Sequence, residues 1–235
     1  MRSMVEIRTR KGAGKGHGFT LIELLVVIAI IAILAGMILA ALRAIFSYRP
    51  SDGPPMPAPT RNMACATVGH LMVLIGGNGA GQAVNVFDIS TESWRRGRAY
   101  PRPEGRAQQG VAVFNQKIYL FGGQTAAGGG SSVDMVDVYE PLRDKWSLDI
   151  ARCPRPVHDP SCIAVGDRIF LFGGDSSGTK IADCYAFDPL RKTWEQLASI
   201  PQALDQTFAI SSDWQYAGMT GSRKNSKIYL IGGEN

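Results

Sequence analysis

The sequence KIYLFGG, at residues 117–123, occurs in four related forms along the chain. HLMVLIGG lies before it and RIFLFGG and KIYLIGG after it, and the first glycines of successive forms are 46, 51 and 59 residues apart. Repetition at intervals of this size indicates a repeat architecture in which each copy forms one supersecondary unit. The four glycine pairs are Gly76 and Gly77, Gly122 and Gly123, Gly173 and Gly174, and Gly232 and Gly233.

Each glycine pair ends a segment in which apolar residues alternate, such as Ile118 and Leu120, and this alternation predicts a β-strand. Paired glycines suit a strand end that takes unusual dihedral angles and lets the next strand pass closely. After the first three pairs come a loop, an aromatic residue followed by an acid (VFDIS, VYEPL and AFDPL), and then a tryptophan. These tryptophans are Trp94, Trp146 and Trp194.

The order of strand, Gly-Gly, aromatic residue with acid, and tryptophan resembles kelch repeats. This resemblance covers residues 61–235 and implies an all-β fold, with four-stranded blades of a β-propeller. Three copies are complete, and the fourth reaches GGEN without its aromatic element and tryptophan. Closed propellers use about 4 to 8 blades, so about three and a half blades predict an incomplete ring. A longer propeller of which this is a part and a dimer that closes the ring both fit this count.

A long apolar segment precedes the repeats. The run Leu24–Leu42 contains no charged residue, and as a helix of 19 residues it spans roughly 28 Å, close to the thickness of a hydrocarbon core. Pro50 and the prolines after it stop the helix. We therefore expect a single transmembrane helix over residues 19–46.

Most of the positive charge lies before this helix. The chain has a formal net charge of +5, yet residues 1–18 hold five Lys or Arg against Glu6 alone, and no basic run follows. The positive charge therefore gives no reason to expect that the repeats bind nucleic acid. A basic leader favours a cytoplasmic N-terminus, which predicts a single-pass inner-membrane protein with the repeats in the periplasm or at the cell surface.

The run GFTLIELLVV, which begins at Gly18, resembles the N-terminus of type IV prepilins and type II secretion pseudopilins. The resemblance implies that prepilin peptidase cleaves between Gly18 and Phe19, that Phe19 is N-methylated, and that Glu23 pairs with a terminal amine during assembly with pilin or pseudopilin subunits. Glu23 lies one helical turn after Phe19, where opposite charges can meet. A carboxylate is also favourable near any helix N-terminus, and this simpler interpretation stays open.

The sequence therefore divides into four parts. A basic leader over residues 1–18 and the helix over 19–46 are followed by a proline-rich linker over 47–60, which we expect to be a semi-rigid spacer. The kelch region occupies residues 61–235.

The four cysteines form no Cys-x-x-Cys pair, so no zinc or redox motif is predicted. Alignment of the copies places Cys65, Cys162 and Cys184 at positions that we expect to be buried as small apolar residues. Cys153 has no equivalent, and a disulfide between Cys153 and Cys162 is left open.

The sequence offers little support for catalysis. After the leader only His70 and His158 remain, which is too few for a copper site, and we expect His158 to be a solvated loop residue beside Asp159. No cofactor or metal is predicted. Loops after the glycine pairs differ in each copy, so we expect a binding module for a protein or glycan. Two alternatives are a minor pseudopilin-like component and, less favoured, a carbohydrate-active kelch enzyme of mutarotase or oxidase type.

Overall fold

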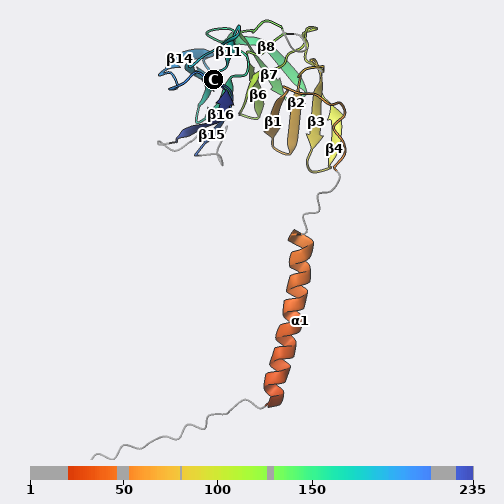
Figure 1. Ribbon diagram of the computed structural model, residues 1–235. Helices are drawn as coiled ribbons and strands as arrows, with labels where there is room; N and C mark the ends of the chain where they lie inside the picture. The colour runs from red at the N-terminus through yellow and green to blue at the C-terminus, as the bar shows by residue number, and fades with distance from the viewer. Residues whose placement is uncertain (1–20, 47–52, 80, 126–129, 213–225, 235) are drawn as a thin grey trace, which may run out of the picture. The chain divides into compact units, whose positions relative to one another are not determined.

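The computed structural model describes residues 21–46, 53–79, 81–125, 130–212 and 226–234. The chain divides into two compact units, Met1–Asp52 and Gly53–Asn235 (Figure 1). In the first unit, helix α1 extends over Leu21–Phe46. Its segment Leu21–Ile38 has a mean hydropathy of 3.0 and no buried side chain, so its length and composition suit a membrane span.

The second unit consists of antiparallel sheets in chain order, and the predicted all-β kelch fold is confirmed. Blade 1 contains β1 (Ala64–Val68), β2 (Leu71–Ile75), β3 (Val84–Asp88) and β4 (Ser93–Arg96). Blade 2 contains β5 (Gly110–Phe114), β6 (Lys117–Phe121), β7 (Met135–Glu140) and β8 (Lys145–Arg152). Blade 3 contains β9 (Ser161–Val165), β10 (Arg168–Phe172), β13 (Cys184–Asp188) and β14 (Thr193–Leu197).

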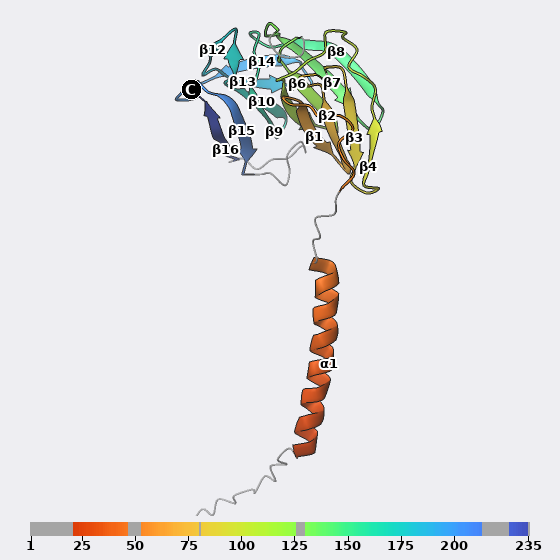
Figure 2. The same cartoon turned by 45° about the vertical axis from the view of Figure 1, so that its right-hand side comes forward.

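The remaining strands form two hairpins. A short one, β11 (Asp175–Ser176) with β12 (Thr179–Lys180), lies in the loop of blade 3 that follows its glycine pair. The other, β15 (Asp205–Ser211) with β16 (Ile228–Glu234), forms the fourth blade, which has only these two strands among the described residues. Figure 2 shows the blades side by side in an open arc. In the part of the chain described, they do not close into a ring.

The first strands of successive blades lie side by side, β1 against β5, β5 against β9 and β9 against β15. They are therefore the inner strands of the propeller. Apolar side chains fill the spaces between blades: one cluster joins blades 1 and 2 and includes Val73, Leu120 and Tyr139, and a second joins blades 2 and 3 and includes Phe121 and Phe187. Burial of apolar surface between neighbouring blades is the main favourable term in such a repeat fold.

The first three glycine pairs occupy positions where a side chain does not fit. Gly122 and Gly123 have φ values of 57° and 98°. A Cβ on Gly122 would lie 2.0 Å from the carbonyl oxygen of Val157, and one on Gly123 would lie 2.7 Å from that of Ala107. Glycine is needed here because the backbone is left-handed and the connection into the next blade passes at van der Waals distance.

The proline-rich segment differs from the expected spacer. Residues from Gly53 onward belong to the kelch unit. The indole N–H of Trp94 donates to the carbonyl of Pro54 at 3.0 Å, and Thr60 Oγ1 donates to the carbonyl of Asn78 at 3.2 Å. Residues 53–60 therefore pack on blade 1, and residues 47–52 lie outside the described part of the chain.

The cysteines are free thiols. Cys184 is buried as predicted, and Cys162 is half-buried beside the second core cluster. The prediction is wrong for Cys65, which is exposed because no blade precedes blade 1 in the described structure. Cys153 is buried in the second cluster, and burial raises its pKa to about 12.

Candidate functional site

Two sets of segments meet at one end of the blades. The loops β2–β3, β6–β7 and β10–β13 lie beside the segments that lead into the inner strands. Isolated bridges join them at equivalent places in three blades: Arg61 with Asn78, Ala107 with Gln124, and His158 with Asp175. We call this end of the propeller the loop face.

A row of polar residues stands where the loop face meets the inner strands. Asn62, Gln108, Asp159 and Gln206 occupy equivalent positions at the start of these strands and have φ values of 57°, 56°, 50° and 51°. The backbone N–H of Gln108 donates to the Asn62 carbonyl at 2.9 Å, and that of Asp159 donates to the Gln108 carbonyl at 2.7 Å. Left-handed backbone in non-glycine residues is uncommon and collects at functional sites. We call these four residues the axial row.

The axial row is tied together by side chains as well. Gln108 Nε2 donates to Asp159 Oδ2 at 2.5 Å. Burial raises the pKa of the Asp159 carboxyl, while His158 and the Gln108 hydrogen bond act against that rise. Asn62 and Gln206, at the two ends of the row, are exposed. The row therefore presents amide and carboxylate groups that can donate to and accept from a ligand.

His158 is not the solvated residue that the sequence predicted. Its side chain is only 12% exposed, and Nδ1 lies 2.8 Å from Ser132 Oγ and 3.8 Å from Asp175 Oδ1. Serine and aspartate thus approach the same ring nitrogen, whereas a catalytic triad needs them on opposite nitrogens. Ser132 lies in the β6–β7 loop and Asp175 in the next blade, so the histidine fastens two neighbouring loops to each other.

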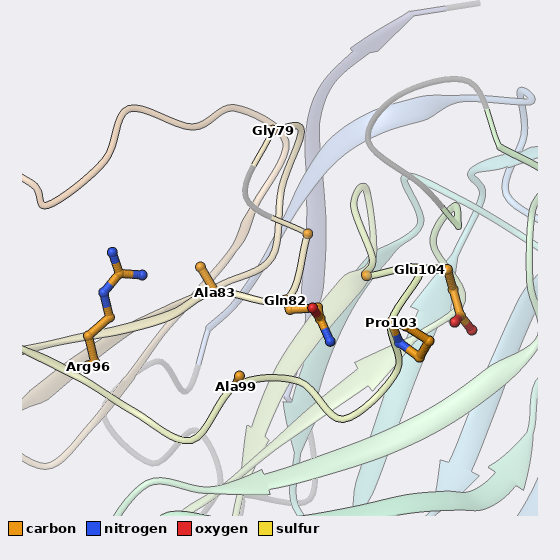
Figure 3. Close-up of a pocket in the computed structure, with 9 residues that line it drawn as sticks. Gly79, Gln82, Ala83, Arg96, Ala99, Pro103 and Glu104 are labelled. Atoms are coloured by element: carbon orange, nitrogen blue, oxygen red, sulfur yellow. The ribbon is translucent and has the colours of Figure 1, made fainter.

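A groove of about 520 Å³ lies on the blade 1 side of the loop face. Figure 3 shows Arg96 and Glu104 toward opposite ends of it, with Gln82 between them. Its two walls touch through glycines: the N–H of Arg106 donates to the Gly81 carbonyl at 3.0 Å, and a Cβ on Gly105 would lie 2.5 Å from Gly81 Cα. The groove is open and lined mostly by glycine and alanine residues, so it suits an extended ligand better than an enclosed small molecule.

A buried ion pair holds the loop face to the blades. Arg106, in the connection from β4 to β5, is 2% exposed, and its Nη1 lies 2.6 Å from Oδ2 of the fully buried Asp137 on β7. Its Nη2 donates to the Met135 carbonyl at 2.6 Å, and Tyr100 OH donates to the same aspartate oxygen at 2.6 Å. Burial is the main cause that raises the pKa of Tyr100 to about 12. Such a satisfied network fixes one arrangement of the connection.

The site residues predicted from the sequence are of two kinds: those that shape the repeats, and those of the N-terminal processing motif. The glycine pairs lie at positive φ, and the tryptophans pack on the aromatic residues of the strand before them: Phe87–Trp94, Tyr139–Trp146 and Phe187–Trp194 have ring centroids 5.0, 4.8 and 4.7 Å apart. Gly18 and Phe19 lie outside the described residues. Glu23 is exposed in the first turn of α1.

Sequence reasoning missed the axial row and the Arg106–Asp137 pair. A signal for the row was present, because in the three complete copies a polar residue lies 14 positions before the first glycine of the pair. No signal marked the ion pair, because 31 residues separate its two members. Within the described ranges, no three His, Cys, Asp or Glu side chains are grouped closely enough to hold a metal ion.

Comparison with known proteins gives two family matches. A model described as the KLHDC2/KLHL20/DRC7 Kelch-repeats domain matches residues 62–235, and one described as the prokaryotic N-terminal methylation motif matches residues 15–39. A solved structure, "Structure of YjhT", superimposes with a TM-score of 0.59 at 16% identity, covering 66% of this chain and 56% of that one. This last likeness supports the fold.

Curated relatives carry the same repeats. Kelch-like protein 25 of Xenopus tropicalis is 25% identical over 190 residues, which cover 76% of this chain and 30% of the relative. Beta-scruin of Limulus polyphemus is 28% identical over 152 residues, 62% of this chain and 15% of the relative. Kelch domain-containing protein 3 of Homo sapiens is 30% identical over 165 residues, 61% of this chain and 42% of the relative.

The chain thus spans less than half the length of these relatives. Its own repeats, the kelch model that matches most of its length, and the sheet topology agree with one another. The chain belongs to the KLHDC2/KLHL20/DRC7 kelch-repeat family, and it joins this domain to a prokaryotic N-terminal methylation motif.

Proposed function

We propose that this protein is a pilin-like, membrane-anchored binding protein whose kelch loop face holds an extended segment of a protein ligand outside the cytoplasm. The observation that carries the proposal is the axial row. Four equivalent residues share a left-handed backbone, and two successive hydrogen bonds link three of them across blades 1, 2 and 3. A polar row repeated from blade to blade matches the repeated amide groups of an extended chain.

The shape of the loop face favours a protein over a small glycan. Small ligands are held in concave pockets that bury most of their surface. The groove beside Arg96 and Glu104 is open, and among the described residues the loops after the glycine pairs contain no aromatic side chain that would stack on a sugar ring. Arg96 at one end and Glu104 at the other provide opposite charges for the two ends of a bound segment.

A binding role also fits the rigidity of the face. The Arg106–Asp137 pair and the Ser132–His158 contact hold loops of neighbouring blades in one arrangement. A preorganised surface loses less conformational entropy on binding. Ser132 and Asp175 both approach Nδ1 of His158, which is not the arrangement of a catalytic triad, so we propose no catalytic role.

The N-terminal helix and its basic leader determine where we expect the kelch unit to lie. We propose that prepilin peptidase removes residues 1–18, that Phe19 is then methylated, and that the new amine lies one helical turn from Glu23. The basic leader favours retention of the N-terminus in the cytoplasm. The kelch unit is then carried to the outer side of the membrane, where a pilin or pseudopilin subunit is a second partner for the helix.

Site-specific photo-crosslinking tests the binding proposal. A photoreactive residue replaces Gln206 on the loop face or, as the matched control, Asn115 in the turn at the opposite end of blade 2; both residues are exposed. In membranes of a host that expresses the full chain, we expect a discrete protein adduct from position 206 and none from 115. Equal adducts from both positions, or an adduct from 206 that glycosidases but not proteases remove, would contradict the proposal.

A further inference from the structure

Exposed apolar side chains gather in one kind of turn. The turns that join the third and fourth strands of blades 1, 2 and 3 each hold one large aliphatic residue: Ile89 is 51% exposed, Leu142 57% and Leu190 77%. Among the described residues of these three blades, they are the large apolar side chains that are exposed. Apolar residues scattered singly need no explanation, but a set confined to one end of the blades indicates a contact surface. We call this end, opposite the loop face, the turn face.

Cations lie beside the apolar residues of blades 2 and 3. Arg143 and Arg191 directly follow Leu142 and Leu190, and their side chains are 76% and 78% exposed. Each arginine pairs with the acid three positions before it and still has most of its side chain in solvent. Lys192 is exposed as well, and its ammonium has no ion-pair partner in the described part of the chain. Apolar side chains next to exposed lysine and arginine are typical of surfaces that lie on anionic lipid.

A groove of about 380 Å³ opens on the turn face between blades 2 and 3. Lys117 of β6, Glu140 at the end of β7, and Leu190 and Lys192 of the β13–β14 turn contribute to its lining. Lys117 Nζ lies 3.1 Å from Glu140 Oε1, and Arg143 Nη1 lies 3.4 Å from Glu140 Oε2. Two cations thus compensate the glutamate, which leaves Lys192 to attract an anionic ligand.

Tyr119, which also lines the groove, has a hydroxyl group without a partner among the described residues. Its side chain is 7% exposed. Burial and then the charge of Glu140 raise the pKa of Tyr119, so the phenol stays protonated and can donate. The equivalent residues of blades 1 and 3 are Val73 and Phe170, so the repeat itself requires no hydroxyl here. Polar groups this little exposed normally have a partner, and this one is available to an acceptor on a ligand.

The chain itself brings lipid within reach of the turn face. Residues 47–52 connect α1 to Gly53, where the kelch unit begins, and six residues span at most about 22 Å. The chain enters this unit beside a turn of the turn face, because the carbonyl of Pro54 accepts a hydrogen bond from Trp94, the second residue of β4. A helix α1 that spans the membrane, as proposed above, therefore keeps the turn face near the headgroups.

We propose that the turn face of blades 2 and 3 is a docking surface for anionic phospholipid, with the groove at Lys117 and Lys192 as its headgroup site. The lipid phosphate accepts hydrogen bonds from the two ammonium groups and from Tyr119. Leu142 and Leu190 enter the boundary between headgroups and acyl chains. The loop face, at the other end of the blades, then stays free for the protein ligand. This docking rests on the proposed membrane anchor and adds a lipid contact outside α1.

Hydrogen exchange in nanodiscs tests the docking. The full chain is inserted into discs of phosphatidylcholine alone and into discs that also contain phosphatidylglycerol, and amide exchange is followed by mass spectrometry. We expect exchange in the turns at residues 140–145 and 188–193 to slow about tenfold in the anionic discs, with no change in the loop-face segment 105–110. Added salt should abolish the difference, because it screens the headgroup charge. Co-elution of the chain with the discs reports the anchor separately from the docking.

Matched variants separate the lipid contact from a change in folding. Leu190→Ser and Lys192→Gln alter exposed side chains of the turn, so each should fold like the parent by circular dichroism and lose the protection. Tyr119→Phe keeps the ring and should reduce the protection. The controls are Phe208→Ser on β15 and Arg61→Gln at the loop face, which alter an exposed apolar residue and an exposed cation away from the turns. Both controls should keep the protection.

Four results would overturn the proposal. The first is co-elution with anionic discs without protection of the two turns, which leaves the anchor intact. The second is equal protection in both kinds of disc, because headgroup charge then has no part. The third is the same protection from inorganic phosphate in phosphatidylcholine discs, because the site then takes a free anion. The fourth is protection in detergent that rises with protein concentration, because the occupant is then a second copy of this chain. A chain that does not co-elute with the discs would contradict the anchor and this docking together.

Discussion

Arg106 of the β4–β5 connection lies 2.6 Å from Asp137 of strand β7, and both side chains are buried. The guanidinium also donates through Nε to the carbonyl of Gly122, in the glycine pair that ends β6. One buried cation therefore links the connection that enters blade 2, the glycine turn of the same blade and its third strand. This contact holds the β4–β5 connection, which forms part of the loop face, against blade 2.

Removal of Arg106 should destabilise the kelch unit strongly. Breaking a buried ion pair leaves one charge without its partner, which costs about 3–5 kcal/mol. We expect Arg106→Ala to lower the free energy of unfolding by this amount, measured by urea denaturation of the full chain in detergent. Arg152→Ala is the control, because Arg152 pairs with Asp134 at 2.8 Å on the surface, where a pair contributes about 1 kcal/mol or less. Equal losses in the two variants would contradict this account.

Tyr100 predicts a specific response to alkaline pH. Burial raises its pKa to about 12, whereas a tyrosine in the unfolded chain ionises near about 10. The protonated phenol therefore contributes stability that is full below pH 10 and is lost as the pH rises toward 12. We expect the Tm advantage of the parent over Tyr100→Phe to shrink across this interval, as followed by circular dichroism. A constant difference would show that the phenol does not titrate there.

The glycine pairs and the tryptophans were predictable because they repeat. Three copies of one pattern placed the strands that end at Ile75, Phe121 and Phe172. The apolar run likewise predicted helix α1. In each case the signal lies in neighbouring residues, whose spacing fixes which side they face.

Substitution at the glycine pairs should cost more than substitution at a free turn. Gly122→Ala forces a left-handed residue, at roughly 1–2 kcal/mol, and also places Cβ 2.0 Å from the Val157 carbonyl oxygen. Gly178 has a φ of 86°, and no atom lies within 4 Å of a new Cβ. Gly178→Ala should therefore lose only the stability that a left-handed backbone costs an alanine. We expect Gly122→Ala to have the lower Tm of the two. Equal Tm values would mean that the connection from blade 2 to blade 3 is not held against β6.

The segment that begins at Gly53 should behave as part of blade 1. The Trp94 indole donates to the Pro54 carbonyl at 3.0 Å, and in blade 2 the Trp146 indole donates to the Arg98 carbonyl at 2.9 Å. The proline-rich segment thus takes the place of an interblade connection. Replacing residues 53–58 with Gly and Ser should speed hydrogen exchange in β3 and β4 and leave β13 and β14 unchanged. Unchanged exchange in β3 and β4 would restore the interpretation as a free spacer.

The features that sequence could not predict depend on contacts between distant residues. Proline content indicates an extended segment, but not that Trp94, 40 residues away, binds to it. Cys65 aligns with the half-buried Val111 and Cys162 of the other blades, yet it is exposed because its burial depends on a preceding blade rather than on its own strand. His158 has a carboxylate neighbour in the chain, Asp159, but the one near its ring nitrogen is Asp175, from the paired loop.

We propose that a processed anchor of the pilin type carries the kelch domain. The most direct test is the intact mass and N-terminal peptide of the protein purified from membranes of a host that has prepilin peptidase. We expect a mature chain that begins at Phe19 and carries one additional methyl group on its amine. A mature chain that retains residues 1–18 would contradict it.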